Sequence, residues 1–253
     1  MKQEILHGDC LKLMIDIPDK SVDAIICDLP YGTTKCKWDV IIPFDKLWAE
    51  YNRIAKDNCP IVLFGGEPFS SYLRLSNIEN YRYDWVWNKK RAANFLFMNK
   101  QPGKIVENIC VFYKKQPTYN PQKRINPAGP HKGSLYKNPS KITKNVKDIM
   151  GDSWKETEMD ASQNYSGKTY EADKLLPNNI LEFVKDTKRL HPTQKPIELC
   201  EYLIKTYTNE GDLILDNCAG SGSILVAAKN LNRQFIGIEK EKEYYDICLE
   251  RLK

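Results

Sequence analysis

Short apolar runs alternate along the chain with stretches whose apolar residues recur at helical spacing. The runs predict buried strands at 21–28, 61–66, 107–113, 212–216 and 234–239. The stretches predict helices at 43–54, 196–207, 224–231 and 244–252. Such alternation favours an α/β domain with a doubly wound, mostly parallel sheet.

The middle of the chain breaks this rhythm. Residues 116–188 are rich in Pro, Asn, Gly, Ser and Lys, and they contain no long apolar element. A stretch of this length is too long for an ordinary connection, which predicts an inserted functional segment or a partly disordered one. We therefore expect one domain in two halves, 1–115 and 189–253, separated by an insert at 116–188.

The composition is typical of a soluble globular protein that needs neither disulfides nor a metal to fold. A chain of 253 residues can bury a sufficient core without disulfides or metals, and 42% hydrophobic with 28% charged residues is typical of soluble globular proteins. No apolar run approaches the roughly 20 residues of a membrane helix, and the N-terminus lacks the apolar region of a secretory signal. Eight cysteines without a C-x-x-C pair and only three histidines favour reduced thiols in a cytoplasmic protein and no metal site.

A glycine-rich turn follows the predicted strand that ends in Asp216. Gly220 and Gly222 let the backbone approach a ligand closely, and the following helix presents free N–H groups. Position 225 is Leu where a NAD-binding motif has its third glycine, and Asp216 would repel a pyrophosphate but attract an ammonium. Glu239, at the end of the next strand, suits ribose hydroxyls. The turn therefore favours S-adenosylmethionine; the alternative is a turn used only for strand–helix packing.

A second candidate site, Asp28-Leu29-Pro30-Tyr31, ends the strand at 21–28. Because ligands of open α/β sheets bind beyond the carboxyl ends of the strands, we expect this motif to face the crevice of the glycine turn. A nucleobase amine is a poor nucleophile because its lone pair is delocalised into the ring. Asp28 and the Leu29 carbonyl, held by the fixed φ of Pro30, would accept its N–H groups and free that lone pair. Tyr31 offers a flat face for an extruded base; the alternative is an ordinary Pro-Gly turn.

These motifs together resemble the DNA amino-methyltransferases, which carry an (Asp/Asn/Ser)-Pro-Pro-Tyr motif and a glycine-rich cofactor turn. The order of catalytic motif, insert and cofactor turn is similar to the β class, and the resemblance covers nearly the whole chain. The segment 191–196 (HPTQKP) closely matches the motif that closes over the methionine end of S-adenosylmethionine. Residues 7–10 (HGDC) are similar to an element whose acid lies near the cofactor adenine. The resemblance implies a Rossmann-like methyltransferase fold.

The resemblance also implies S-adenosylmethionine as cofactor. The implied binding residues come from these motifs: Asp9, Cys10, His191, Thr193, Lys195, Asp216, Cys218, Ala219, Gly220, Ser221, Gly222 and Glu239. Two residues depart from the family pattern, since Leu29 stands where Pro is usual and Cys218 where an aromatic residue is usual. These departures keep open the alternative of a catalytically silent subunit that binds cofactor and DNA.

Positive charge is concentrated in and beside the insert. Residues 114–147 hold nine basic and no acidic residues, which leaves 29 basic and 33 acidic residues elsewhere, so the net charge of +5 divides into a basic segment and a mildly acidic remainder. Basic side chains would neutralise DNA phosphates; the alternative is a solvated lysine-rich loop. The candidate DNA-binding residues are Lys89, Lys90, Arg91, Lys123, Arg124, Lys132, Lys137, Lys141 and Lys144.

We therefore predict a bacterial or phage-encoded, site-specific DNA methyltransferase that modifies the N6 amine of a flipped-out adenine. Asp rather than Ser at position 28 favours adenine in this family, and cytosine-N4 methylation is the alternative. Methylation of cytosine C5 is disfavoured because the chain has no Pro-Cys pair, only Cys59-Pro60 in the reverse order. The expected partner is double-stranded DNA with a short specific site. A homodimer and a cognate restriction endonuclease are both compatible with the sequence, which selects neither.

Overall fold

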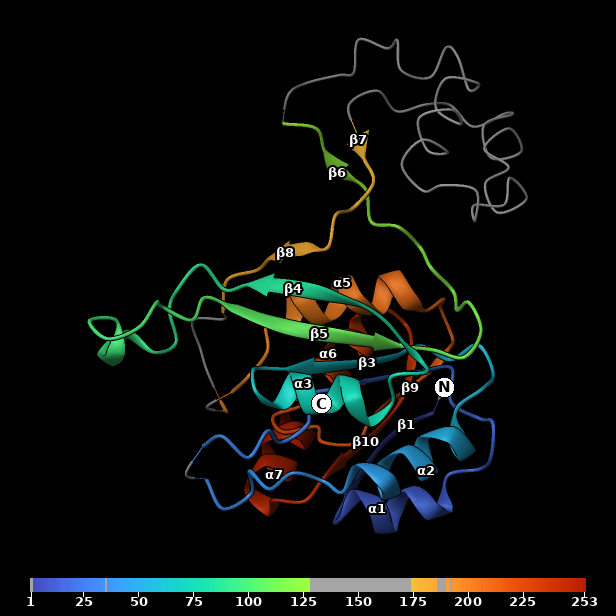
Figure 1. The fold of residues 1–253 in the computed structure, drawn as a ribbon. Helices are drawn as coiled ribbons and strands as arrows, with labels where there is room; N and C mark the ends of the chain where they lie inside the picture. The colour runs from blue at the N-terminus through green and yellow to red at the C-terminus, as the bar shows by residue number, and fades with distance from the viewer. Residues whose placement is uncertain (1, 35, 128–173, 186–189, 192) are drawn as a thin grey trace, which may run out of the picture. The chain divides into compact units, whose positions relative to one another are not determined.

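The computed structural model describes residues 2–34, 36–127, 174–185, 190–191 and 193–253 (Figure 1). Its contacts divide the chain into two compact units, residues 1–122 with 178–253 and residues 123–177. In the first unit, the described strands form one eight-stranded sheet in the order β1-β10-β9-β2-β3-β5-β4-β8. These strands are β1 (Gln3–His7), β2 (Ala24–Cys27), β3 (Ile61–Gly65), β4 (Tyr81–Asn88), β5 (Val106–Phe112), β8 (Ile180–Glu182), β9 (Leu213–Asp216) and β10 (Gln234–Glu239).

The sheet is mostly parallel, as the sequence predicts. From β1 through β3 each strand runs parallel to its neighbour, whereas β5 is antiparallel to both β3 and β4. Strand β8 pairs in parallel with the end of β4, so part of the predicted insert belongs to this sheet. The accompanying helices are α1 (Cys10–Leu13), α2 (Phe44–Ile54), α3 (Phe69–Ser76), α5 (Ile197–Tyr207), α6 (Ser223–Asn230) and α7 (Lys242–Arg251), with 3-10 turns η1 (Met14–Asp16) and η2 (Phe95–Phe97).

Two apolar layers cover the faces of the sheet, because successive residues of a strand point to opposite sides. In β2, Ile25 and Cys27 pack into the layer that contains α1, α2 and α3. Ala24 and Ile26 pack into the opposite layer, which contains α5 and α6. All four residues are fully buried, so an almost uniformly apolar strand identifies the centre of the sheet.

Helix α2 shows why the predicted helical spacing was informative. Its buried residues Leu47, Trp48, Tyr51 and Ile54 recur at intervals of one, three and three residues and so share one face. The indole N–H of Trp48 donates to Ser76 Oγ at 2.8 Å, which ties α2 to the end of α3. The apolar face of α2 therefore packs into the layer that covers one face of the sheet.

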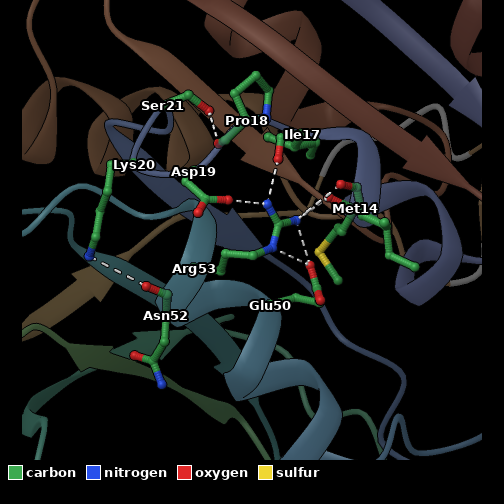
Figure 2. A network of polar contacts seen from close by, with 10 residues as sticks. Met14, Ile17, Pro18, Asp19, Lys20, Ser21, Glu50, Asn52 and Arg53 are labelled. Carbon is green, nitrogen blue, oxygen red and sulfur yellow. Dashed lines mark hydrogen bonds and ion pairs between the residues drawn. The ribbon is translucent and has the colours of Figure 1, made fainter.

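Arg53, near the end of α2, organises the chain before β2 (Figure 2). Its guanidinium donates to the backbone carbonyls of Met14 (2.7 Å) and Ile17 (2.8 Å). It also pairs with Asp19 at 2.6 Å and with Glu50 at 2.7 Å. The fork geometry of arginine suits this set of convergent acceptors. Arg53 thus holds the connection that leads into β2, the strand directly before Asp28.

The second unit, residues 123–177, contains a short antiparallel pair, β6 (Arg124–Ile125) with β7 (Lys174–Leu175), among its described residues. The predicted insert at 116–188 is wider than this unit at both ends. No helix in the described part of the chain is long and apolar enough to span a membrane. All eight cysteines are free thiols.

Candidate active site

The predicted site lies where the sheet reverses its direction of winding. Strand β9 leads through α6 to β10 on one side, whereas the neighbouring β2 leads through α2 to β3 on the other. Helices α6 and α2 belong to opposite faces of the sheet. A crevice therefore opens beyond the carboxyl ends of β9 and β2, which is where open α/β sheets bind ligands.

A cavity of about 270 Å³ occupies this position. All four residues of the predicted catalytic motif line it, from Asp28 to Tyr31. Eleven of the twelve predicted cofactor residues line it as well, and Gly222 is the exception. The lining cofactor residues are Asp9, Cys10, His191, Thr193, Lys195, Asp216, Cys218, Ala219, Gly220, Ser221 and Glu239. The fold thus gathers segments from both halves of the sequence around one cavity.

The glycine turn after β9 adopts a backbone that favours glycine. Gly220 has a φ of 53° and Gly222 a φ of 79°, both in the left-handed region. A Cβ at Gly222 would also overlap Cys248 Sγ. The Gly220 N–H donates to Glu239 Oε2 at 2.7 Å, which fixes the turn against β10. This conformation leaves the backbone of the turn open to close approach by a ligand.

Two buried carboxyl groups line the cavity at the ends of β9 and β10. Asp216 is 1% exposed, and burial raises its pKa to about 7, although a hydrogen bond from the Cys218 N–H opposes the shift. Burial also raises the pKa of Glu239, against hydrogen bonds from the backbone N–H groups of Glu241 and Gly220. A cationic ligand would favour the ionised form of Asp216. These two acceptors therefore fit S-adenosylmethionine, whose ammonium group and ribose hydroxyls are hydrogen-bond donors.

The N-terminal element forms another wall of the cavity. Asp9 is the N-cap of α1, and its Oδ1 accepts the N–H of Leu11 at 3.0 Å. A hydrogen bond with the Cys218 thiol, together with burial, raises the pKa of Cys10. The Cys10 thiol is therefore protonated at neutral pH. Cys218 and Cys10 both present small, weakly polar surfaces to the cavity.

Two aromatic residues flank His191 in the wall of the cavity. The ring centroid of His191 lies 4.1 Å from that of Tyr244 and 5.1 Å from that of Trp38. Burial and the charge of Lys195 lower the pKa of His191 to about 4, so the imidazole is neutral at physiological pH. Its Nδ1 accepts the N–H of Thr193 at 3.2 Å. Sequence reasoning missed Trp38 and Tyr244, because neither belongs to a motif with a recognisable spacing.

Asp28 is the centre of a buried polar cluster at the end of β2. Its Oδ1 accepts the hydroxyl of Tyr31 at 2.7 Å, and its Oδ2 accepts the Lys195 ammonium at 2.6 Å. The Tyr31 ring stacks on Phe69, with centroids 4.9 Å apart and planes inclined by 23°. Burial raises the pKa of Asp28, although Lys195 and Tyr31 oppose the shift. Both oxygens of the carboxylate are therefore oriented before any substrate binds.

Two further residues complete this cluster. Lys195 also lies 3.5 Å from Glu107 Oε2, and the ammonium of Lys89 lies 2.9 Å from Glu107 Oε1. The two lysines hold the pKa of Glu107 below its ordinary value, even though burial opposes this. Asp28, Lys195, Glu107 and Lys89 thus form an alternating chain of charges. Sequence reasoning had not given Glu107 a role, and its position at the start of β5, beside β3, was not evident from spacing.

Lys89 corrects one sequence-based expectation. We predicted a phosphate contact for it, but its side chain is only 4% exposed and its ammonium pairs with Glu107 inside the protein. A buried, paired ammonium is not presented to a DNA backbone. Lys89 is better placed beside the catalytic motif than on a DNA-binding surface.

Asp39 holds the loop that follows the catalytic motif. Its carboxylate accepts the backbone N–H groups of Gly32, Thr33 and Thr34 at 2.8, 2.9 and 2.6 Å. Partial burial acts to raise the pKa of Asp39, but hydrogen bonds from Thr34 and the other donors lower it below its ordinary value. The carboxylate is therefore ionised, and it fixes the chain directly after Tyr31.

Comparison with known proteins identifies the family of this chain. The sequence profile of a DNA methylase family, N6_N4_Mtase, matches residues 22–250. The chain belongs to this family. The predicted membership of the N6/N4 DNA amino-methyltransferases is thereby confirmed.

Curated relatives of this DNA methylase come from several bacteria. It is 26% identical to the Type II methyltransferase M.HpaI of Haemophilus parainfluenzae, over 100% of this chain and 74% of that protein. It is 28% identical to the Type II methyltransferase M2.DpnII of Streptococcus pneumoniae, over 100% of this chain and 90% of that protein. It is also 27% identical to the DNA adenine methyltransferase YhdJ of Escherichia coli (strain K12), over 98% of this chain and 82% of that protein.

Two solved structures are similar to the DNA methylase over its whole length. The M1.HpyAVI–SAM complex has a TM-score of 0.63 and 26% identity, and the match covers 100% of both chains. The PvuII DNA methyltransferase, which is cytosine-N4-specific, has a TM-score of 0.69 and 17% identity over 100% of this chain and 87% of that one. The second likeness concerns the fold alone. The predicted Rossmann-like methyltransferase fold is confirmed.

The other candidate DNA-binding residues of the DNA methylase are distributed over both units. Lys90 and Arg91 are exposed after β4, and Lys90 pairs with Glu182 at 2.9 Å. Lys123 and Arg124 belong to the second unit. The remaining candidates lie outside the described residues: Lys132, Lys137, Lys141 and Lys144.

Proposed function

We propose that this DNA methylase transfers a methyl group from S-adenosylmethionine to the N6 amine of adenine in double-stranded DNA. The observation that carries the proposal is the position of Asp28, which shares one cavity with the glycine turn after β9. A carboxylate at that place can accept an N–H of a target amine while the donor lies on the neighbouring strand end. When bound, S-adenosylmethionine supplies a methyl group that its sulfonium already activates, so no nucleophilic side chain is needed.

The residues at the end of β2 have separate roles in this proposal. Asp28 accepts one N–H of the target amine, and the backbone carbonyl of Leu29 accepts the other. Tyr31 orients the Asp28 carboxylate through its hydroxyl at 2.7 Å and offers its ring as a stacking surface for the base. Asp28, whose pKa is raised by burial, is also positioned to take the proton that the amine loses after transfer. Placement and electrostatics supply most of the acceleration.

Lys195 and Glu107 maintain the charge balance of this pocket. The ammonium of Lys195 lies 2.6 Å from Asp28 and 3.5 Å from Glu107, and it is buried between them. Two buried carboxylates at such short range would otherwise raise each other's pKa. Lys195 therefore keeps Asp28 available as an acceptor, a role in addition to the cofactor contact predicted from the sequence.

Adenine is the proposed base, and cytosine-N4 is a second candidate. Asp at the first position of the motif favours adenine, and the relative YhdJ is named a DNA adenine methyltransferase. The similarity of fold to the PvuII cytosine-N4 enzyme supports the second candidate. Both bases present an amino group in a similar ring frame, so the acceptors at Asp28 and Leu29 suit either one.

We also propose that the insert at 116–188 recognises the target, and that the substrate is double-stranded DNA carrying a short specific site. A restriction–modification context is proposed because M.HpaI and M2.DpnII are Type II methyltransferases. A cognate endonuclease and a homodimer remain proposals within that context.

The direct test incubates the purified protein with tritiated S-adenosylmethionine and mixed-sequence DNA. We expect tritium in the DNA from the wild-type protein and none from Asp28→Ala, which should still bind S-adenosylmethionine in a calorimetric titration. Asp45→Ala, an exposed acid in the first turn of α2, is the matched control and should methylate at the wild-type rate. Absence of DNA labelling by the wild-type protein, with cofactor binding intact, would support the silent-subunit alternative instead.

A further inference from the structure

The connection between β4 and β5 displays a cluster of large apolar side chains to solvent. Figure 1 shows this connection reaching away from the sheet. Phe95, Leu96, Phe97 and Met98 are 69%, 73%, 56% and 54% exposed, and we call these four residues the apolar tip. Scattered single apolar residues are ordinary on a protein surface, but consecutive large ones mark an interaction site.

The apolar tip is held in place by a built scaffold. The side chain of Asn94 bridges the two arms, because its Nδ2 donates to the Pro102 carbonyl at 3.1 Å and its Oδ1 accepts the Lys104 N–H at 2.6 Å. The Ala93 N–H donates to the Lys104 carbonyl at 3.0 Å. A Cβ at Gly103 would lie 3.0 Å from Ala92 Cβ, so glycine lets the arms approach closely. The connection therefore presents the tip in a defined conformation.

The charge around the tip is positive. Residues 89–106 contain five basic and no acidic residues. Lys89 is buried, whereas Lys90, Arg91, Lys100 and Lys104 are exposed on the two sides of the tip. An apolar cluster between exposed cations matches a duplex, whose phosphates bind the cations while its base stack admits apolar side chains. The same charges would repel one another across an interface between two copies of this chain.

The connection is rooted at the catalytic pocket. Its first arm begins with Lys89 and its second arm leads into Glu107, and these two residues pair at 2.9 Å. Glu107 in turn lies 3.5 Å from Lys195, which binds Asp28. Both arms therefore leave the protein beside the place proposed for the target amine.

We propose that the apolar tip is a wedge that enters the DNA duplex and stabilises it while the target base is extruded. This inference rests on the proposed function. Extrusion leaves a gap in the base stack, and unstacking costs free energy that inserted apolar side chains can offset. Phe95, Leu96 and Phe97 supply the surface that fills the gap, and the flanking cations bind the phosphates around it.

The test compares two synthetic duplexes that carry the recognition site, first identified by sequencing DNA methylated by the wild-type protein. One duplex is normal, and in the other the nucleotide opposite the target base is abasic, so the target is already unpaired. Single-turnover methylation is measured for the triple variant Phe95→Ala, Leu96→Ala, Phe97→Ala. Leu75→Ala is the matched control, because Leu75 on α3 is 71% exposed, close to the 73% of Leu96.

On the normal duplex we expect the triple variant to be about 10- to 100-fold slower than wild type, since extrusion costs most for a paired base. On the abasic duplex its rate should lie within about threefold of wild type, because extrusion is then cheap. The Leu75 control should match wild type on both.

Equal rates for triple variant and wild type on the normal duplex would overturn the wedge, as would an equal loss on both duplexes. A loss of self-association in sedimentation, with equal rate losses on both duplexes, would instead assign the tip to a second copy. A wild-type protein that methylates neither duplex overturns the proposed function and the wedge with it.

Discussion

We predict that Asp216 makes the binding of S-adenosylmethionine dependent on pH. It is buried at the end of β9, and burial raises its pKa to about 7. A bound ammonium group favours the ionised carboxylate, so binding must release a proton wherever the carboxyl is protonated beforehand. The affinity for S-adenosylmethionine should therefore increase as the pH rises toward 7 and through it.

The size of this effect follows from the pKa. If only the ionised form holds the ammonium, the Kd at pH 6 is about tenfold weaker than its limiting value, which corresponds to about 1.4 kcal/mol. The gain ends as the pH approaches roughly 7.7–8.0, where α-amino groups lose their own proton. The tightest binding is thus expected between the pKa of Asp216 and that of the donor's amino group.

The same carboxyl should affect the stability of the cofactor-free protein. Its native pKa lies above its ordinary value of 3.8, so the native state holds a proton that the unfolded state releases between these two values. Stability therefore falls as the pH rises through that window, by about 1.4 kcal/mol for each pH unit attributable to this group. Asp216→Asn removes this contribution and should make the cofactor-free protein more stable than wild type at pH 8.

Isothermal titration calorimetry of S-adenosylmethionine between pH 6 and 8 measures the first effect, and urea unfolding at pH 8 measures the second. Asp216→Asn should bind more weakly at pH 7.5 and lose the pH dependence. Asp212→Asn, just before the start of β9, is the control and should behave as wild type in the titration. A wild-type Kd that is flat from pH 6 to 7.5, or a slope that Asp216→Asn retains, would refute this reasoning.

Three further predictions test the site and its support. Lys195→Met leaves Asp28 and Glu107 with one fewer cation. In a plot of methylation rate against pH, the apparent pKa on the acid side should therefore increase by about 1–3 units, and an unchanged value would contradict the charge-balance role. Tyr31→Phe removes the hydroxyl that orients Asp28, and kcat should fall about 10- to 100-fold with an unchanged KM for DNA; a change in KM alone would argue against this role. Arg53→Ala strips donors from the carbonyls before β2, so urea unfolding should show a loss of about 1–3 kcal/mol, and a value near zero would show that the network in Figure 2 is dispensable.

The centre of the fold was predictable from the sequence because its strands are almost uniformly apolar. Strands β2, β3 and β9 are buried on both faces, and such strands form short continuous apolar runs. The edges were not predicted. Strands β1 and β8 lie at the sheet edges and contain polar residues, and β4 carries Arg82 and Asp84 between its aromatic residues. Edge strands and mixed strands lack the periodic signal that identified the centre.

The candidate site divides in a similar way. The residues that motifs identified, such as Asp28 and Gly220, follow strand ends, and strand ends of a doubly wound sheet meet by topology. Glu107 and Trp38 were not given roles. Glu107 comes close to Lys195 only because β5 pairs with β3, and Trp38 reaches the cavity through a loop. Lys89 was misassigned because its place among other basic residues resembles a charged surface, whereas Glu107 holds it inside. The roles of these residues depend on contacts in the folded chain, which the spacing of residues along the sequence does not encode.

The most direct test of the proposed function is the chemical identity of the modified base. DNA methylated by the wild-type protein is digested to nucleosides, and the methylated nucleosides are separated and identified by mass spectrometry. The proposal predicts N6-methyladenosine in its deoxy form, present with wild-type protein and absent with Asp28→Ala. N4-methylcytosine in place of it would contradict the assigned base, and no methylated nucleoside from wild-type protein would contradict the enzymatic function itself.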